Sequence, residues 1–313
     1  MKLRRSARAA FVTLLLSVGL LAVPVQAQAA GPSDADLAYR WAPVHYQDSA
    51  SSSYTADYLS RVDYDGEWNT LNNWENLDAN AARLTGTAYY SVVETSTHWY
   101  ITYAFYHPRD WKLSSHENDM EGVLEVVVKD GSTYGTLQAA VTQAHNNYYS
   151  YIPAGSPFQG NRENIDGTLL METHDGAQHP TVFQEAKGHG MYNWSGGSFP
   201  GGDGIVYRPS RGAGTVPTGG NDRAASYELV DIFSSGGLWE RRDSKPPYAS
   251  WGTFAGDNGT DNAAHTPWAW DDSNDGSDLQ AGSIAGDPAY LISKYFKNTG
   301  TFNLTYTRNS YLS

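Results

Sequence analysis

One short segment, residues 110–121 (DWKLSSHENDME), holds an imidazole and several carboxylates directly before an apolar run at 122–128 (GVLEVVV). The β-branched residues of that run are typical of a buried strand. If the strand already begins at Asp119, then Asp119 and Glu121 point to the same face, because side chains alternate along a strand. His116 and Asp110 then lie on the loop that leads into it. Several carboxylate oxygens with one imidazole nitrogen suit a hard divalent cation such as calcium, magnesium or manganese.

Two other interpretations of this segment stay open. In a helix, His116 and Asp119 would lie on one face, because they are three residues apart, but Glu121 would not. A helix would therefore separate the carboxylates that a strand places together. Acidic residues at a strand entry also occur as a simple solvated turn, and H-x-x-D-x-E is a short pattern. The residues by themselves therefore leave a metal site and a solvated turn as alternatives.

The N-terminal residues have the order of a secretion signal. An apolar stretch at 9–25 and an A-x-A cleavage sequence at 27–29 follow four basic residues, Lys2, Arg4, Arg5 and Arg8. The apolar stretch is short and is broken at Pro24, so we expect cleavage rather than a permanent anchor. The sequence predicts a signal peptide at 1–29, a single β-rich domain over 30–313, no transmembrane segment, and secretion.

The chain after the predicted signal peptide is acidic and contains no cysteine. It has 17 basic and 34 acidic residues, which gives a net charge of −17. Such a charge repels nucleic acid and anionic membranes, so neither is the expected partner. Without cysteine, thiol catalysis, thiolate zinc sites and disulfides are excluded. The 22 tyrosines and 10 tryptophans suit stacking on sugar rings or a lipid interface, as well as the core of a β-protein.

Strand patterns dominate the rest of the chain. Alternating or β-branched segments predict strands at 87–93, 98–106, 121–128, 137–143 and 181–186. Short helices are predicted at 75–83 and 287–296, a long loop at 194–222, and an ordered surface loop at 251–278. These patterns predict a mainly β fold with long loops and a few short helices.

Several of these segments resemble a known family. Residues 100–110 (YITYAFYHPRD) followed by 116–128 (HENDMEGVLEVVV) resemble the core of the necrosis-inducing protein family, in which a similar strand leads to a heptapeptide containing H-x-x-D-x-E. Ala144-His145 is similar to that family's later S-A-H position. Residues 179–192 (HPTVFQEAKGHGMY) resemble the following segment, in which a strand ends in a small residue and a histidine.

Other segments look closer to the vacuolar protein sorting-associated protein 62 family. Residues 37–48 (LAYRWAPVHYQD), 250–259 (SWGTFAGDNG) and 264–271 (AHTPWAWD) are similar to its opening and late motifs, so the likeness covers roughly 37–272. The chain departs from both patterns: Met120 stands where a tryptophan is usual, and Asn118 where histidine or glycine is usual. These departures argue against carrying over the plant-toxin activity of the necrosis-inducing branch.

The resemblance implies an antiparallel β-sandwich with an acidic cavity that holds a divalent cation. It assigns Asp110, His116, Asp119 and Glu121 to the metal site, directly or through water. His145 and His189 become nearby candidates for ligand binding, and Trp111 a candidate for contact with the ligand. The implied partner is an extracellular glycan, or the head group of a glycolipid or phospholipid.

Catalysis is less well supported than binding. The sequence contains neither a G-x-S-x-G nucleophile elbow nor an H-E-x-x-H zinc motif. Carboxylate pairs such as Glu121 with Glu125 or Asp119 still allow acid–base hydrolysis of a glycan, and Glu121, His145 and His189 are the catalytic candidates. We therefore favour a cation-dependent recognition protein over two alternatives, a metal-assisted hydrolase of a glycan or phosphoester and an extracellular structural protein with a purely structural ion.

Overall fold

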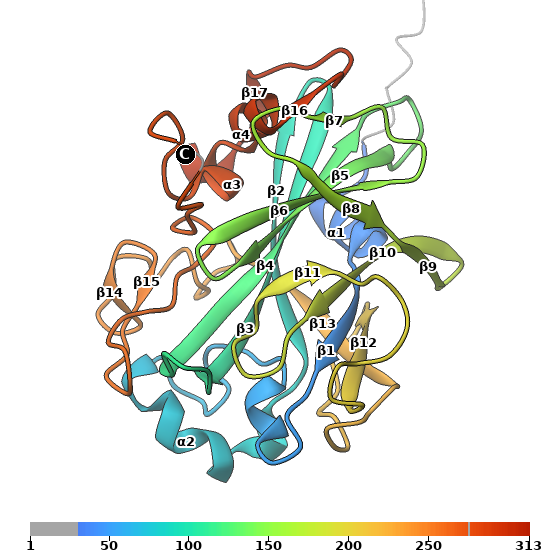
Figure 1. Cartoon of the computed structure of the whole chain (residues 1–313). Coiled ribbons are helices and arrows are strands. Elements are labelled where there is room, and N and C mark those ends of the chain that lie inside the picture. The colour runs from blue at the N-terminus through green and yellow to red at the C-terminus, as the bar shows by residue number, and fades with distance from the viewer. Residues whose placement is uncertain (1–30, 275) are drawn as a thin grey trace, which may run out of the picture. The chain divides into compact units, whose positions relative to one another are not determined.

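Two long antiparallel strands lie at the centre of the fold (Figure 1). In this computed structural model, β3 (His98–Asp110) and β4 (His116–Val128) pair along almost their whole length, from His98 opposite Val128 to Asp110 opposite His116. The structure describes residues 31–274 and 276–313, and the predicted signal peptide at 1–29 lies outside them.

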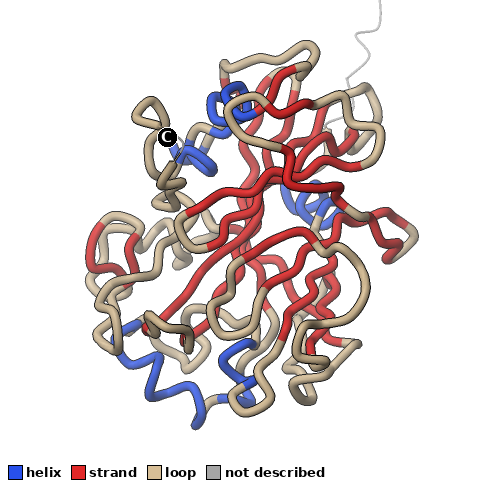
Figure 2. Tube along the Cα trace, in the orientation of Figure 1, coloured by secondary structure: helices blue, strands red, loops and turns tan. Residues whose placement is uncertain are grey.

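β3 and β4 belong to one large sheet, in the order β11-β10-β1-β12-β13-β2-β3-β4-β5-β6-β8. β9 also pairs with β10, and β17 with β2. The strand β11 lies close to β5, so the two ends of this order approach each other (Figure 2). The other strands of the sheet are β1 (Val44–Asp48), β2 (Thr87–Thr95), β5 (Thr136–Ala144), β6 (Asn147–Pro153), β8 (Ile165–Leu169), β9 (Met171–His174), β10 (Ala177–Gln184), β11 (Met191–Asn193), β12 (Gly204–Ser210), β13 (Ala225–Asp231) and β17 (Tyr306–Arg308).

Short helices and two small sheets complete the described fold. Ser33 caps the first helix, since its hydroxyl accepts a hydrogen bond from the Asp36 backbone N–H. No helix among the described residues is long and apolar enough to cross a bilayer. The helices are α1 (Asp34–Trp41), α2 (Asn73–Ala79), α3 (Ser283–Gly286) and α4 (Pro288–Tyr295), and the small sheets pair β14 (Tyr248–Ser250) with β15 (Thr253–Phe254) and β7 (Gln159–Gly160) with β16 (Phe296–Lys297).

The two faces of β4 pack into different apolar cores. Val123 and Val127 belong to a core that also contains residues of α1, whereas Met120 and Leu124 belong to a second core covered by the C-terminal part of the chain. This alternation is the period of two expected for a strand buried on both faces. Asp119, Glu121 and Glu125 therefore point to the side of the first core, and Met120 to the other side.

One carboxyl group lies inside the first core. Glu125 is fully buried, and among the described residues neither of its oxygens has a hydrogen-bond partner. Burial raises the pKa of Glu125 well above its ordinary value, and the charge on Arg40 opposes the shift only in part. Burial therefore disfavours the charged form of Glu125 in the folded protein.

The predicted mainly β class is confirmed, but the antiparallel arrangement is not. Four strand pairs of the large sheet are parallel: β1 with β10, β12 with β13, β13 with β2, and β6 with β8. Two of these pairs, β1 with β10 and β13 with β2, join strands far apart in the chain, and period-two patterning carries no information on such pairing.

The prediction of a continuous loop at 194–222 was wrong, because β12 lies within it. Pro209 interrupts the strand pattern there, and proline is a signal against a central strand. The strand forms through its neighbours, antiparallel to β1 and parallel to β13.

Candidate functional site

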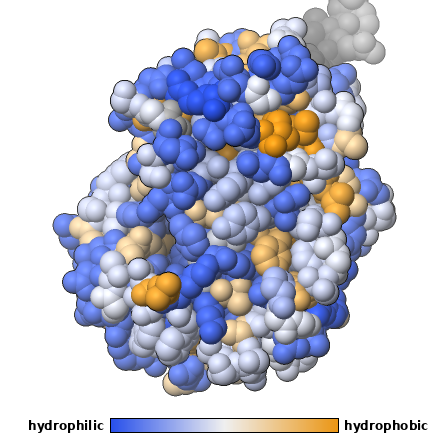
Figure 3. Space-filling view, in the orientation of Figure 1, coloured by the Kyte–Doolittle hydropathy of each residue, from blue (hydrophilic) through white to orange (hydrophobic). Residues whose placement is uncertain are grey.

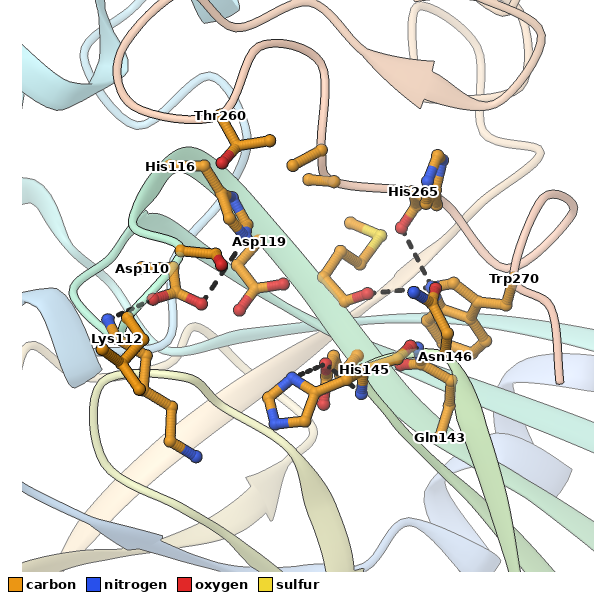
Figure 4. A pocket seen from close by; sticks show the side chains of 16 residues that line it. Asp110, Lys112, His116, Asp119, Gln143, His145, Asn146, Thr260, His265 and Trp270 are labelled. Atoms are coloured by element: carbon orange, nitrogen blue, oxygen red, sulfur yellow. Dashed lines mark hydrogen bonds and ion pairs between the residues drawn. The ribbon is translucent and has the colours of Figure 1, made fainter. Parts of the chain in front are cut away.

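Three predicted metal ligands meet where the β3–β4 pair ends. Asp110 and His116 are opposite each other in the ladder, and Asp110 Oδ2 lies 3.5 Å from His116 Nε2. One ligand atom from each of Asp110, His116 and Asp119 lies within 4.8 Å of the others (Figure 4). The prediction that Asp110 and His116 lie on a loop was wrong, because both are strand residues. Pairing thereby fixes their backbones more firmly than a loop would.

Asn118 sets the path of β4 between His116 and Asp119. Its φ is +62°, a left-handed conformation that asparagine tolerates better than most residues. Its side chain is buried and anchored on both sides: Oδ1 accepts hydrogen bonds from Tyr106 (2.6 Å) and Asn73 (2.9 Å), and Nδ2 donates to Thr70 O (3.1 Å). These contacts hold the kink that brings Asp119 beside His116.

The tautomer of His116 follows from the same kink. His116 Nδ1 lies 2.7 Å from Asn118 O, which can only accept, so Nδ1 carries the proton. In the neutral ring the lone pair of Nε2 then faces Asp110. A metal-binding histidine characteristically has its other ring nitrogen bonded to a carbonyl or carboxylate in this way.

A buried imidazole and a second carboxylate lie behind Asp119. His189 Nδ1 is 3.0 Å from Asp119 Oδ2, and His189 Nε2 is 3.3 Å from Asp57 Oδ1. Asp57 also accepts hydrogen bonds from the backbone N–H groups of Ala50 and Lys187, each at 2.7 Å. The ring of His107 stacks on that of His189 with centroids 3.8 Å apart. His189 is fully buried, so it orients Asp119 from behind.

The charged side chains of this group shift one another's pKa values. Burial lowers the pKa of His189, but hydrogen bonds to Asp119 and Asp57 outweigh it and raise the pKa to about 10. Burial likewise raises the pKa of Asp119, yet the bond to His189 lowers it below its ordinary value. Burial and the charge of Asp119 raise the pKa of Asp110. A cation between Asp110 and Asp119 would relieve that repulsion, so the donor set fits a hard divalent ion.

Replacing Asp57 by asparagine is expected to weaken cation binding about tenfold. Residues that orient a metal ligand typically contribute 10–100-fold to affinity, and Asp57 holds His189 against Asp119. Calcium or manganese titration at a temperature where both proteins are folded measures the change. Asp63→Asn removes a carboxylate from the same segment that pairs instead with Arg61 and should leave the affinity unchanged. Equal affinity in Asp57→Asn and wild type would contradict the role given to Asp57.

Glu121, the fourth predicted ligand, lies beside the three-residue cluster but is not part of it. Its Oε1 accepts a hydrogen bond from the His145 backbone N–H (2.7 Å), and its buried Oε2 has no partner among the described residues. Burial and the charge of Asp119 raise the pKa of Glu121 well above its ordinary value. Glu121 therefore lies at the pocket wall with one buried oxygen that has no partner among the described residues.

His145 connects Glu121 to a second charged group. His145 Nδ1 is 3.4 Å from Glu121 Oε1, and His145 Nε2 is 2.9 Å from Glu185 Oε1, which is also paired with Lys112. The hydrogen bond to Glu185 raises the pKa of His145. Burial raises the pKa of Glu185, but His145 and Lys112 outweigh it and lower the pKa to about 2.

Glu121, His145 and the three-residue cluster line one pocket of about 400 Å³. The face shown in Figure 3 is predominantly hydrophilic, with scattered apolar spots. The pocket is lined by Asp110, Lys112, Leu113, Ser114, His116, Asp119, Met120, Glu121, Gln143, His145, Asn146, Thr260, Ala263, Ala264, His265 and Trp270.

Not every predicted site residue reaches this pocket. Trp111 is 39% exposed and packs with Trp74 around Arg109, outside the pocket lining. His189 is buried behind Asp119, so it cannot touch a ligand directly. Glu125 lies in the first core, so the predicted acid–base pair of Glu121 and Glu125 does not form in the pocket.

One pocket wall was not predicted, because it comes from distant residues 257–270. This segment is joined to the entry of β4 by backbone hydrogen bonds from Glu117 N to Asn258 O (3.2 Å) and from Thr260 N to Ser115 O (3.0 Å). Gly259 makes the approach possible, since a Cβ there would lie 1.8 Å from Ser115 O. The tryptophans of this segment were the only sequence signal for it. They indicated a family motif but did not indicate where the segment lies in the fold.

Comparisons with known proteins give only remote matches. No family model and no curated protein matches the chain. Solved structures similar to it include one described as a toxin fold for microbial attack and plant defense, with 17% identity over 53% of this chain and 72% of that chain and a TM-score of 0.35. A complex of NLPPya with mannosamine has 17% identity over 56% and 74% of the two chains and a TM-score of 0.33.

A third solved structure is necrosis and ethylene inducing protein 2 from the causal agent of cocoa's witches' broom disease. It has 11% identity over 69% of this chain and 92% of that chain, with a TM-score of 0.32. Its name is that of the family that residues 100–128 resemble. The likeness to the vacuolar protein sorting-associated protein 62 family stays a prediction.

Proposed function

We propose that this protein is a secreted, divalent-cation-dependent recognition protein for a glycan, or for the head group of a glycolipid or phospholipid. One observation carries the proposal: ligand atoms of Asp110, His116 and Asp119 converge within 4.8 Å at the wall of a pocket of about 400 Å³. Calcium, magnesium or manganese held there would keep coordination positions for oxygens of the bound molecule. Secretion rests on the sequence of residues 1–29.

The pocket favours binding over turnover. Glu185 is paired with Lys112 and His145. Glu121 has one oxygen without a partner among the described residues, but burial raises its pKa, which disfavours the carboxylate form that a base needs. A hydrolase would need a free base directed at a water on the cation.

Sugar binding is expected to require the cation. Chelator-treated protein should bind no glycan on an array, and calcium, magnesium or manganese should restore binding, because sugar hydroxyls complete the coordination of the ion. The sugar should be recovered unchanged. Binding that persists in excess chelator would contradict the proposal.

A metal-assisted hydrolase is the second candidate, favoured by the position of His145 between Glu121 and Glu185. It predicts cation-dependent product from labelled glycans or phosphoesters, with loss of product in Glu121→Ala or His145→Ala. The third candidate is a structural protein with a purely structural ion. In that case chelation should lower the melting temperature, and the protein should bind no glycan or head group with or without the ion.

A further inference from the structure

A second pocket lies on another part of the large sheet. It has a volume of about 400 Å³ and shares no lining residue with the cation pocket. Its walls come from the end of β12, the start of β13, the turn between β9 and β10, and α1. Because β12 and β13 are parallel neighbours, with Tyr207 opposite Ala225, the segments that leave β12 and enter β13 can both contribute side chains to it.

Three arginines line this second pocket: Arg208, Arg211 and Arg223. The chain as a whole has 34 acidic and 21 basic residues, so this group reverses the general charge locally. Among the described residues of the lining, Asp175 is the one carboxylate, and it accepts a hydrogen bond from the Tyr39 hydroxyl. The pocket therefore presents more positive than negative groups to an occupant.

Arg208 is held in place by the structure around it. Its Nη2 lies 2.8 Å from Glu172 Oε1 on β9, and its Nη1 donates to Arg223 O (3.1 Å). Glu172 is not part of the pocket lining. These two contacts tie Arg208 to β9 and to the entry of β13, so its guanidinium forms a fixed wall.

Arg211 and Arg223 keep most of their donors free. Arg211 Nη1 lies 3.3 Å from Asp36 Oδ1, which is outside the lining. Among the described residues Arg223 has no carboxylate partner, and its hydrogen bond from Nη2 to Gly202 O is 3.4 Å long. A guanidinium has five N–H donors, so each of these two arginines can still donate to a ligand from its remaining nitrogens.

Aromatic rings limit the movement of both free arginines. Arg211 Cζ lies 4.0 Å from the centroid of the Tyr39 ring, and Arg223 Cζ lies 4.3 Å from that of Phe199. Tyr39 and Phe199 are both buried. Stacking on buried rings restricts the guanidinium groups before any ligand arrives, which lowers the conformational entropy lost on binding.

We propose that this second pocket binds a phosphate or sulfate group, carried by a free ion or by a monoester. Guanidinium groups match the oxygens of these anions through paired N–H donors, and three arginines can share one tetrahedral group. A carboxylate has two oxygens and a single charge, so it would use this set of donors less fully. A smaller pocket of about 250 Å³ shares Tyr39, Ser210 and Arg211 with the second pocket and gives room for the organic part of an ester.

Calorimetric titration tests the site and distinguishes the two sources of the anion. The protein as purified, in a buffer without added metal, phosphate or sulfate, is titrated with inorganic phosphate, inorganic sulfate and glycerol 3-phosphate, with glycerol as the neutral control. At least one of the three anions should bind with one site per chain, and glycerol should not bind. Glycerol 3-phosphate that binds at least as tightly as inorganic phosphate supports an ester site, and weaker binding supports a site for the free ion. Binding of none of the anions would overturn the inference.

Arg211→Gln and Arg223→Gln should each weaken anion binding about tenfold, because each variant loses a charged donor group. Both arginines are exposed, so both variants should fold. Arg83→Gln removes the same charge from an exposed position outside the pocket and should bind as wild type does. Unchanged binding in Arg211→Gln and Arg223→Gln, or an equal loss in Arg83→Gln, would overturn the inference.

Asp119→Asn separates this site from the proposed cation site. This variant loses a proposed cation ligand but no residue of the second pocket, so it should bind the anion as wild type does. Loss of anion binding in Asp119→Asn would place the anion at the cation pocket and overturn the inference. Failure of cation binding in wild type would contradict the proposed function and leave the anion site standing.

Discussion

Asp119→Asn is expected to lower the affinity for calcium or manganese by more than about 100-fold. Asp119 is central to the cluster, since it shares the proposed ion with Asp110 and His116 and is held from behind by His189. Loss of an orienting partner alone costs 10–100-fold in metal sites, and loss of a direct ligand should exceed that. Asparagine has nearly the shape of the aspartate side chain and keeps a hydrogen-bond acceptor for His189. The loss of calcium affinity should therefore come from the missing negative charge and from the weaker amide ligand.

Isothermal titration of chelator-treated protein measures this affinity, and a thermal melt with and without calcium supplies a second readout. Calcium should raise the melting temperature of wild type and not that of Asp119→Asn, because an ion that binds only the folded state stabilises it. Asp243→Asn, whose side chain is 81% exposed and lies 4.0 Å from Arg242, is the matched control and should respond to calcium as wild type does. Equal calcium affinity in Asp119→Asn and wild type would remove Asp119 from the site.

The second large effect is expected from Glu125→Gln and depends on pH. The pKa of Glu125 is raised in the folded state, so above its ordinary value the folded chain keeps a proton that the unfolded chain releases. The free energy of unfolding of wild type therefore falls as pH rises through this window, by up to about 1.4 kcal/mol per pH unit. Glutamine has no proton to release. The variant should therefore gain stability relative to wild type as the pH rises from 5.

Urea unfolding at pH 5, 6, 7 and 8 gives the free energy of unfolding against pH for wild type and for Glu125→Gln. They should diverge with rising pH, and Glu240→Gln on the exposed surface should run parallel to wild type. A constant difference between Glu125→Gln and wild type across this range would show that Glu125 is charged in the folded protein.

The strand pattern predicted the local geometry of the segment that carries Asp119 and Glu121. A β-branched run after H-x-x-D-x-E gives a strand whose alternation directs Asp119 and Glu121 to one face, and both line the pocket. The position of His116 was mistaken for a loop because Ser114-Ser115-His116-Glu117 has no strand propensity. Pairing of β4 with β3 extends the strand to His116 and overrides that propensity.

The parts that were missed depend on contacts between distant segments. Asp57 lies in a short 3₁₀ turn, Tyr54–Asp57, with no motif around it, yet it bonds to His189 more than 130 residues later. The wall at 257–270 has a composition of turns, and only its bonds to Ser115 and Glu117 place it over the cation site. Such pairings follow from packing of the whole sheet, which single-sequence periodicity does not encode.

The most direct test of the central claim is a manganese titration of chelator-treated protein followed by electron paramagnetic resonance. The account predicts one bound manganese per chain in wild type, displaced by calcium, and none at the same concentration in Asp110→Asn or Asp119→Asn. Absence of bound manganese and calcium in wild type, or the same single site in both variants, would contradict a cation site at Asp110, His116 and Asp119.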